Sequence, residues 1–414
     1  MKINNRTLAL ASLGLVSLPG IVQAEEKQNN LLTSLSSTTI SGYVDTSAHW
    51  NLGTGNANVP GFLYSTAGKS DGFNLNKVKL SIEKPLDESQ WAAGYKADLQ
   101  FGPDANVFGT TSTGLATSDF AIQQAYVALR APVGNGLDFK MGVFDSVIGY
   151  ESHDSVNNPN YTRSYGVNIE PHTHTGLLAT YQLSEAASLS AGIANTFGPT
   201  INARAHNGAG NGVGTPYKAE SYKTYMASIA LTAPEKWGWV GGSGLYAGLV
   251  NGYNAGAGTG VRGADQTSLY VGGTLATPVK GLKLGASYDA ALIGAQPGVS
   301  GSQYANATAI YASFALPDTK LTLHARGEYF TQSGSAAAVS PSVLSGQPGE
   351  VLAFTGTVQY DLWKNVLSRL EFRWDHQADG LGHAYGAPSA PGAASGPGTR
   401  RNAVLIAANV VYKF

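Results

Sequence analysis

Residues 369–375, RLEFRWD, alternate between ions and large apolar side chains. The odd positions hold the charges, from Arg369 to Asp375, and the even positions hold the apolar groups: Leu370, Phe372 and Trp374. Because successive side chains point to opposite faces of a β-strand, this period of two predicts a strand with one ionic and one apolar face. The ionic face would meet bulk water or a water-filled interior.

The same alternation recurs along the chain. Residues 91–101, 137–144 and 320–330 each place apolar side chains on one parity and charged ones on the other, and 402–414 keeps the apolar parity with a weaker polar one. We count sixteen such segments, starting near residues 39, 73, 91, 119, 137, 174, 188, 222, 244, 267, 282, 304, 320, 351, 366 and 402. The pattern predicts an all-β protein.

The links between these segments alternate in length. Short links, such as 84–89 and 131–136, follow the even-numbered segments, whereas long links rich in glycine, serine and proline follow the odd-numbered ones. Outer-membrane barrels have short periplasmic turns and long external loops. We therefore predict a closed antiparallel transmembrane β-barrel of about 16 strands, in a range of about 14 to 18, with a lumen too wide for side chains to fill.

The composition supports a membrane barrel. Charged residues make up 13% of the chain, about half the usual share. Without residues 1–24, 24 basic residues face 27 acidic ones, so the charge balance excludes nucleic acid as an expected partner. Cysteine is absent, which excludes disulfides and thiolate metal sites. No apolar run of about 18 residues follows residue 24, so we expect no membrane-spanning helix there.

The N-terminal residues predict an export signal. A start containing Lys2 and Arg6 precedes the apolar run 7–18, and a small-residue cleavage site ends at Ala24. The apolar run is too short to cross a membrane as a helix. We expect a protein of the outer membrane of a Gram-negative-type bacterium. Its predicted divisions are a signal peptide (1–24), a short periplasmic extension (25–38) and the barrel (39–414).

Several stretches of the first half carry a family likeness: GYVD (42–45), FNLN (73–76), EKPLDES (83–89), DLQFGPDAN (98–106), QAYVALR (124–130), GNGLDFKMGVFDSVIGYES (134–152), NNPNYTRSYG (157–166) and GIANTFGPTIN (192–202). They resemble the type-2 β-barrel porin family of outer-membrane channels. The resemblance implies a porin-like channel and brings no catalytic or substrate residues. Phe414 also resembles the closing aromatic by which outer-membrane proteins are recognised for insertion.

The long link 149–173, between predicted strands five and six, is the main candidate site. In sixteen-stranded porins the third external loop folds inward, and by that analogy we predict that this link narrows the pore. An external loop packed on its neighbours is the other interpretation. The candidate constriction residues are Glu151, Asp154, Arg163 and Glu170.

Parity places a second set of candidates on the pore wall. These inward-facing residues would either set a transverse field that selects ions or pair across strands without selecting anything. The predicted pore-lining residues are Lys77, Lys79, Lys96, Asp98, Asp138, Lys140, His324, Arg326, Glu328, Arg369, Glu371 and Arg373.

Three other motifs do not support a site. His172 and His174 share a strand face but lack a third ligand at a known spacing. Residues 153–155 are of the types found in a catalytic triad, but because they are consecutive their side chains point in different directions. No helix follows the glycine runs 208–214 and 256–260, as a phosphate-binding loop requires. We therefore expect no metal, cofactor or catalytic residue.

The sequence thus predicts an outer-membrane porin that passes small hydrophilic solutes or ions by passive diffusion. We expect outer-membrane lipid to surround the barrel. The sequence leaves open whether the protein forms a homotrimer. Two other classes also stay open at this point: a barrel enzyme that hydrolyses lipids or esters, and a secreted soluble β-sandwich with a binding site.

Overall fold

The computed structural model describes residues 37–53, 55–108, 110, 118–203, 222–254, 264–295, 301–333, 347–387 and 398–414. Within these ranges the chain forms sixteen β-strands. They are β1 (Thr39–Trp50), β2 (Gly72–Lys84), β3 (Ala92–Phe101), β4 (Phe120–Ala131), β5 (Leu137–Asp145), β6 (Thr173–Ser184), β7 (Ala187–Ala194), β8 (Thr224–Thr232), β9 (Gly244–Asn254), β10 (Ala264–Ala276), β11 (Leu282–Ile293), β12 (Gln303–Ala315), β13 (Leu321–Gln332), β14 (Glu350–Trp363), β15 (Val366–Gln377) and β16 (Asn402–Lys413).

The helical segments of the described residues are short. They are η1 (Ala67–Lys69), α1 (Pro103–Phe108), η2 (Ser155–Asn157), α2 (Tyr165–Ile169) and η3 (Glu235–Val240). In this part of the chain, no helix has the length and apolar character needed to cross a bilayer.

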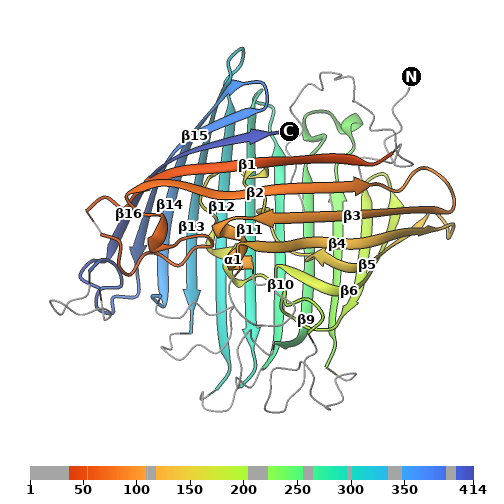
Figure 1. The fold of residues 1–414 in the computed structure, drawn as a ribbon, viewed down its shortest axis with the longest axis horizontal. Coiled ribbons are helices and arrows are strands. Elements are labelled where there is room, and N and C mark those ends of the chain that lie inside the picture. Colours follow the sequence, from red (N-terminus) through yellow and green to blue (C-terminus); the bar gives the residue numbers. More distant parts are fainter. Residues whose placement is uncertain are drawn as a thin grey trace.

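The strands form one closed antiparallel barrel. Each strand pairs with its sequence neighbours, and β1 pairs with β16 in a register that runs from Tyr43 opposite Lys413 to Trp50 opposite Ile406. Figure 1 shows β1 to β6 crossing in front of the wall that continues through β9 to β15. Closure gives every strand two partners, which satisfies the backbone in lipid. The predicted sixteen-strand barrel is confirmed, and the soluble β-sandwich is wrong because a sandwich has open sheet edges.

The predicted strand positions agree closely with the observed ones. The largest difference in a starting residue is at β10, which begins at Ala264 instead of residue 267. The predicted link 361–365 is shorter than expected, because β14 continues until Trp363 pairs with Val366. The resulting two-residue turn ends at Asn365, whose φ of 67° is a left-handed conformation that asparagine tolerates.

Strand β15 contains the opening RLEFRWD stretch and has the two unlike faces that its alternation predicts. Arg369 and Arg373 are buried inside the barrel, whereas Leu370 is 57% exposed and Phe372 is 43% exposed on the outside. A shift of one residue in register would exchange the two faces and put the arginines into lipid. The outward apolar face therefore fixes which side chains reach the interior.

The segments that precede the barrel fall largely outside the described residues. This holds for the predicted signal peptide, residues 1–24, and for all but the last two residues of the predicted extension, 25–38. The glycine runs 208–214 and 256–260 also lie outside them.

Candidate functional site

The loop between β5 and β6 enters the barrel. We call residues 149–172 the inner loop; it contains η2 and α2, and α2 packs against β11, β12 and β13. Hydrogen bonds join the same loop to inward-facing side chains of β1 and β2 and of β13 and β15. These strands form one arc of the wall around the β1–β16 seam, whereas the loop starts at β5 and ends at β6, on the other half of the closed barrel. The inner loop therefore crosses the interior.

Asp154 anchors one side of the inner loop. Its carboxylate lies 2.7 Å from the Lys79 ammonium and accepts a hydrogen bond of 3.0 Å from the Tyr43 hydroxyl. The ammonium of Lys77 donates to the neighbouring carbonyl of His153 at 2.7 Å. Burial alone would raise the pKa of Asp154, but the two ammonium groups and these hydrogen bonds lower it to about 2. Asp154 is therefore ionised and paired.

Arginines of β13 and β15 provide a second set of anchors for the inner loop. Arg326 lies 2.9 Å from the Glu151 carboxylate and donates at 2.8 Å to the carbonyl of Thr162. Arg369 donates to two loop carbonyls, those of Ser155 at 3.0 Å and Asn158 at 2.5 Å. In the same way Arg373 donates at 2.7 Å to the carbonyl of Arg163. Each arginine thus satisfies polar groups of an irregular segment that has left bulk water.

Wall carboxylates complete the anchoring by accepting loop N–H groups. Glu371 accepts hydrogen bonds from the backbone of Tyr161 at 2.6 Å and of Thr162 at 2.9 Å. Glu328 accepts one from the backbone of Tyr165 at 2.7 Å, at the start of α2. The alternating ions of β13 and β15 therefore match both the donors and the acceptors of the inner loop.

The other two candidate residues of the loop have different surroundings. The guanidinium of Arg163 donates within its own loop, to the carbonyls of Ser152 at 3.1 Å and Tyr161 at 2.8 Å. Glu170 lies beside Asp289 of β11, and burial followed by the charge of that carboxyl raises the pKa of Glu170 well above its usual value. Thus Arg163 braces the loop, and Glu170 packs it against the wall.

The remaining predicted wall residues pair with other wall residues. Lys96 lies 3.1 Å from Glu83, Asp98 lies 3.1 Å from Lys79, and Asp138 lies 2.6 Å from Arg130. Lys140 lies over the Tyr126 ring at 4.9 Å, and the Nδ1 of His324 lies 2.8 Å from the Ser313 hydroxyl. Lys96, Asp98 and Asp138 therefore form ion pairs within the wall, whereas Lys140 and His324 have uncharged partners.

The sequence interpretation missed the first external link. Phe62 lies under the Arg373 guanidinium at 4.0 Å, and the ring of Tyr64 lies 5.2 Å from the Lys77 ammonium. The same ring lies 5.6 Å from the guanidinium of Arg163. The sequence did contain a signal for these contacts, because Phe62 and Tyr64 are aromatic residues in an otherwise glycine-rich link.

Part of the interior wall is apolar. An apolar cluster lines the interior at β5 to β10, where Ile148, just before the inner loop, and Tyr150, within it, pack with wall residues. The buried wall members are Phe144, Leu178, Ala194, Met226, Val250 and Tyr270. These residues occupy inward positions, so the loop has an ionic contact with one part of the wall and an apolar contact with another.

His172, at the end of the inner loop, and His174, in β6, each lie within hydrogen-bonding distance of an oxygen atom of the protein. The Nε2 of His172 lies 3.3 Å from the carbonyl of Val167, and the Nε2 of His174 lies 3.2 Å from the Ser146 hydroxyl. In the described ranges, no group of three histidine, cysteine or carboxylate side chains has a metal-binding arrangement.

Comparisons with known proteins agree with this architecture. A family model described as "Putative beta-barrel porin-2, OmpL-like" matches residues 37–414. A search of the curated proteins found no match.

Three solved structures illustrate the fold similarity. An anion-selective porin from Comamonas acidovorans is 12% identical, with a TM-score of 0.57 over 91% of this chain and 99% of that one. The outer-membrane channel DcaP of Acinetobacter baumannii is 12% identical, with a TM-score of 0.55 over 91% and 97%. The trimer form of OmpT from Vibrio cholerae is 13% identical, with a TM-score of 0.50 over 91% and 99%.

Proposed function

Because this chain belongs to the beta-barrel porin-2, OmpL-like family and is an outer-membrane porin, we propose that it passes small hydrophilic solutes or ions by passive diffusion. One observation carries the proposal: a polar loop that joins β5 and β6 is held across the interior of a closed barrel by ions of β2 and β13, on the other half of the wall. In this proposal the inner loop narrows the path, and Glu151, Asp154, Arg163 and Glu170 form the constriction.

The wall ions have a defined part in this proposal. Arg326, Arg369 and Arg373 act mainly as anchors, because their donors are directed at loop carbonyls and carboxylates. Selection among solutes then depends on the width left beside the loop and on the groups that keep free hydrogen-bonding capacity. The proposal includes no catalytic step, metal or cofactor.

Liposome swelling with sugars of increasing size tests the channel. With protein reconstituted in lipid vesicles, we expect arabinose to enter fastest, glucose more slowly and raffinose slowest, because a narrowed pore discriminates by size. Steps of conductance in KCl across a planar bilayer would provide a second measurement. Vesicles that do not swell in arabinose, together with bilayers that show no steps, would contradict the proposal.

We also propose that three barrels assemble in the membrane. The support is the fold similarity to a Vibrio cholerae protein whose structure is described in a trimer form. The molecular mass of the detergent-purified complex measures the assembly, since one chain has a mass of 43.0 kDa. A mass of one chain, after subtraction of detergent, would contradict the trimer.

A further inference from the structure

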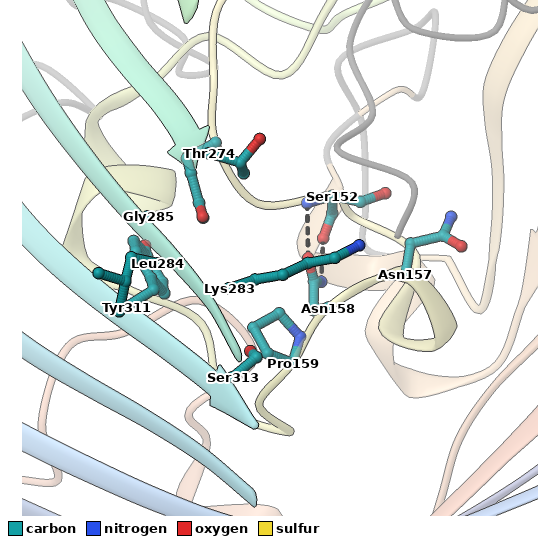
Figure 2. A pocket seen from close by; sticks show the side chains of 11 residues that line it. Ser152, Asn157, Asn158, Pro159, Thr274, Lys283, Leu284, Gly285, Tyr311 and Ser313 are labelled. Carbon is teal, nitrogen blue, oxygen red and sulfur yellow. Dashed lines mark hydrogen bonds between the residues drawn. The ribbon is translucent and has the colours of Figure 1, made fainter. Parts of the chain in front are cut away.

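A pocket lies between the inner loop and the wall at the end of the barrel that has the short turns. Tyr150, Ser152 and residues 157–159 form its loop side. Its wall side is formed by the residues of β10, β11 and β12 that lie near the short turns (Figure 2). The empty space, which includes the open mouth, is about 490 Å³. Short turns face the periplasm in outer-membrane barrels, so the pocket faces that compartment.

Lys283 is the only cation that lines this pocket among the described residues. Its side chain extends across the space toward Ser152 and Asn158 (Figure 2). Glu235 of η3 attracts it electrostatically, yet no carboxylate of the described ranges forms an ion pair with it. By contrast, Lys79 and Arg326 each lie 2.7 Å from a carboxylate oxygen. Lys283 thus keeps donors that Lys79 and Arg326 have already used.

Two further polar side chains of the pocket have no hydrogen-bond partner within the described part of the chain. They are the amide of Asn157, on the loop side, and the hydroxyl of Thr274, on β10. Thr274 pairs with Gly285 across the sheet, and Lys283 pairs with Ser313. The free ammonium and the free hydroxyl therefore come from neighbouring strands of one surface.

The rest of the pocket is already fixed by internal contacts. Asn158 accepts a hydrogen bond of 2.8 Å from the backbone of Ser152 and returns one of 2.6 Å to its carbonyl. The rings of Tyr150 and Tyr311 stack with a centroid distance of 4.2 Å and an interplanar angle of 18°. Gly285 leaves the space that the Tyr150 hydroxyl fills, since a Cβ there would lie 1.9 Å from it. Such a wall needs little rearrangement to receive a solute.

The free groups define the chemistry of a ligand. An ammonium favours a carboxylate through charge-assisted hydrogen bonds, while an amide and a hydroxyl suit a hydroxyl group. No carboxylate lines the pocket in the described residues, so a cation would meet no opposite charge. The tyrosine rings supply an apolar surface for the carbon chain.

We propose that Lys283, Asn157 and Thr274, beside the stacked Tyr150 and Tyr311, form a binding subsite for small hydroxycarboxylate anions. The proposal rests on the channel function above and names a class of solute for it. The subsite would hold such an anion at the periplasmic end of the path.

Titration calorimetry of the detergent-solubilised full chain with sodium lactate tests the subsite. We expect saturable binding that Lys283→Met weakens about tenfold or more, because a charge-assisted contact is lost. Lys283→Arg should restore most of the affinity. Lys280→Met, which changes an exposed lysine in the adjacent turn, is the matched control and should leave it unchanged. Glycerol, which is of similar size but neutral, should show no saturable binding.

Two outcomes would overturn the subsite. The first is that the wild-type protein shows no saturable binding of lactate. The second is that wild type and Lys283→Met bind lactate equally, when heat-modifiable gel mobility shows that both proteins are folded. Conductance in KCl separates this failure from that of the channel. Protein that conducts but binds no lactate overturns the subsite and keeps the channel. Protein whose lactate binding is weakened by Lys283→Met, but which neither conducts nor admits sugars, keeps the binding site and overturns the channel.

Discussion

Replacing Arg326 by alanine is expected to release the inner loop and to raise the single-channel conductance severalfold. The guanidinium is fully buried and contacts Glu151, Glu328 and the carbonyl of Thr162. Its removal would leave the buried Glu151 without a cation, whereas Glu328 keeps Arg373 at 3.6 Å. Breaking a buried pair in this way costs about 3–5 kcal/mol. The docked loop has no other cation placed to neutralise Glu151 within the described residues, so the loop should leave the interior.

Planar-bilayer recordings in KCl measure this effect. Arg400→Ala is the matched control, since it removes an arginine whose side chain is exposed next to β16. The control should keep the conductance of the wild type. An Arg326→Ala channel with wild-type conductance and wild-type noise would show that the loop does not depend on this anchor.

Phe372→Arg is expected to lower the free energy of unfolding of the barrel in lipid by about 2–4 kcal/mol, the cost of a cation near the middle of the bilayer. Phe372 lies at the centre of β15 on its outward face. The change leaves the inward ions of the strand in place. Urea unfolding in lipid vesicles, followed by tryptophan fluorescence, measures the difference.

Ser368→Arg provides the comparison on the same strand. Ser368 has the same parity as Phe372 but lies near the two-residue turn, where an arginine costs only about 0–1 kcal/mol. The two variants should therefore differ clearly in stability. Equal losses, or no loss for Phe372→Arg, would mean that this face does not meet the hydrocarbon.

The fold could be predicted from sequence because a period of two is imposed by strand geometry itself. Each strand must separate lipid from the interior, so the alternation marks both its position and its faces. In β15, the alternation of Arg369 with Leu370 and of Arg373 with Phe372 indicates both the position of the strand and its two faces. The length of the turn at Asn365 was harder to predict, because apolar residues such as Trp363 continue the strand beyond the expected boundary.

The site could be predicted only in part. The placement of the inner loop came from analogy, and parity identified the ions that meet it. The groups that these ions bind could not be predicted from the sequence. Arg369, for example, binds the backbone carbonyls of Ser155 and Asn158, and a backbone carbonyl is present whatever the side chain is. The apolar interior near Leu178 and Met226 did leave a signal, since apolar residues there break the polar parity.

The anchoring of the inner loop also has a consequence for the order of assembly. Its contacts join residues far apart in the chain, with 111 positions between Tyr43 and Asp154 and 214 between Ser155 and Arg369. The loop therefore reaches its final place only after the first and last hairpins have met. We therefore expect removal of water from the loop backbone to accompany the closure of the barrel between β1 and β16, and contacts of such long sequence separation to form slowly.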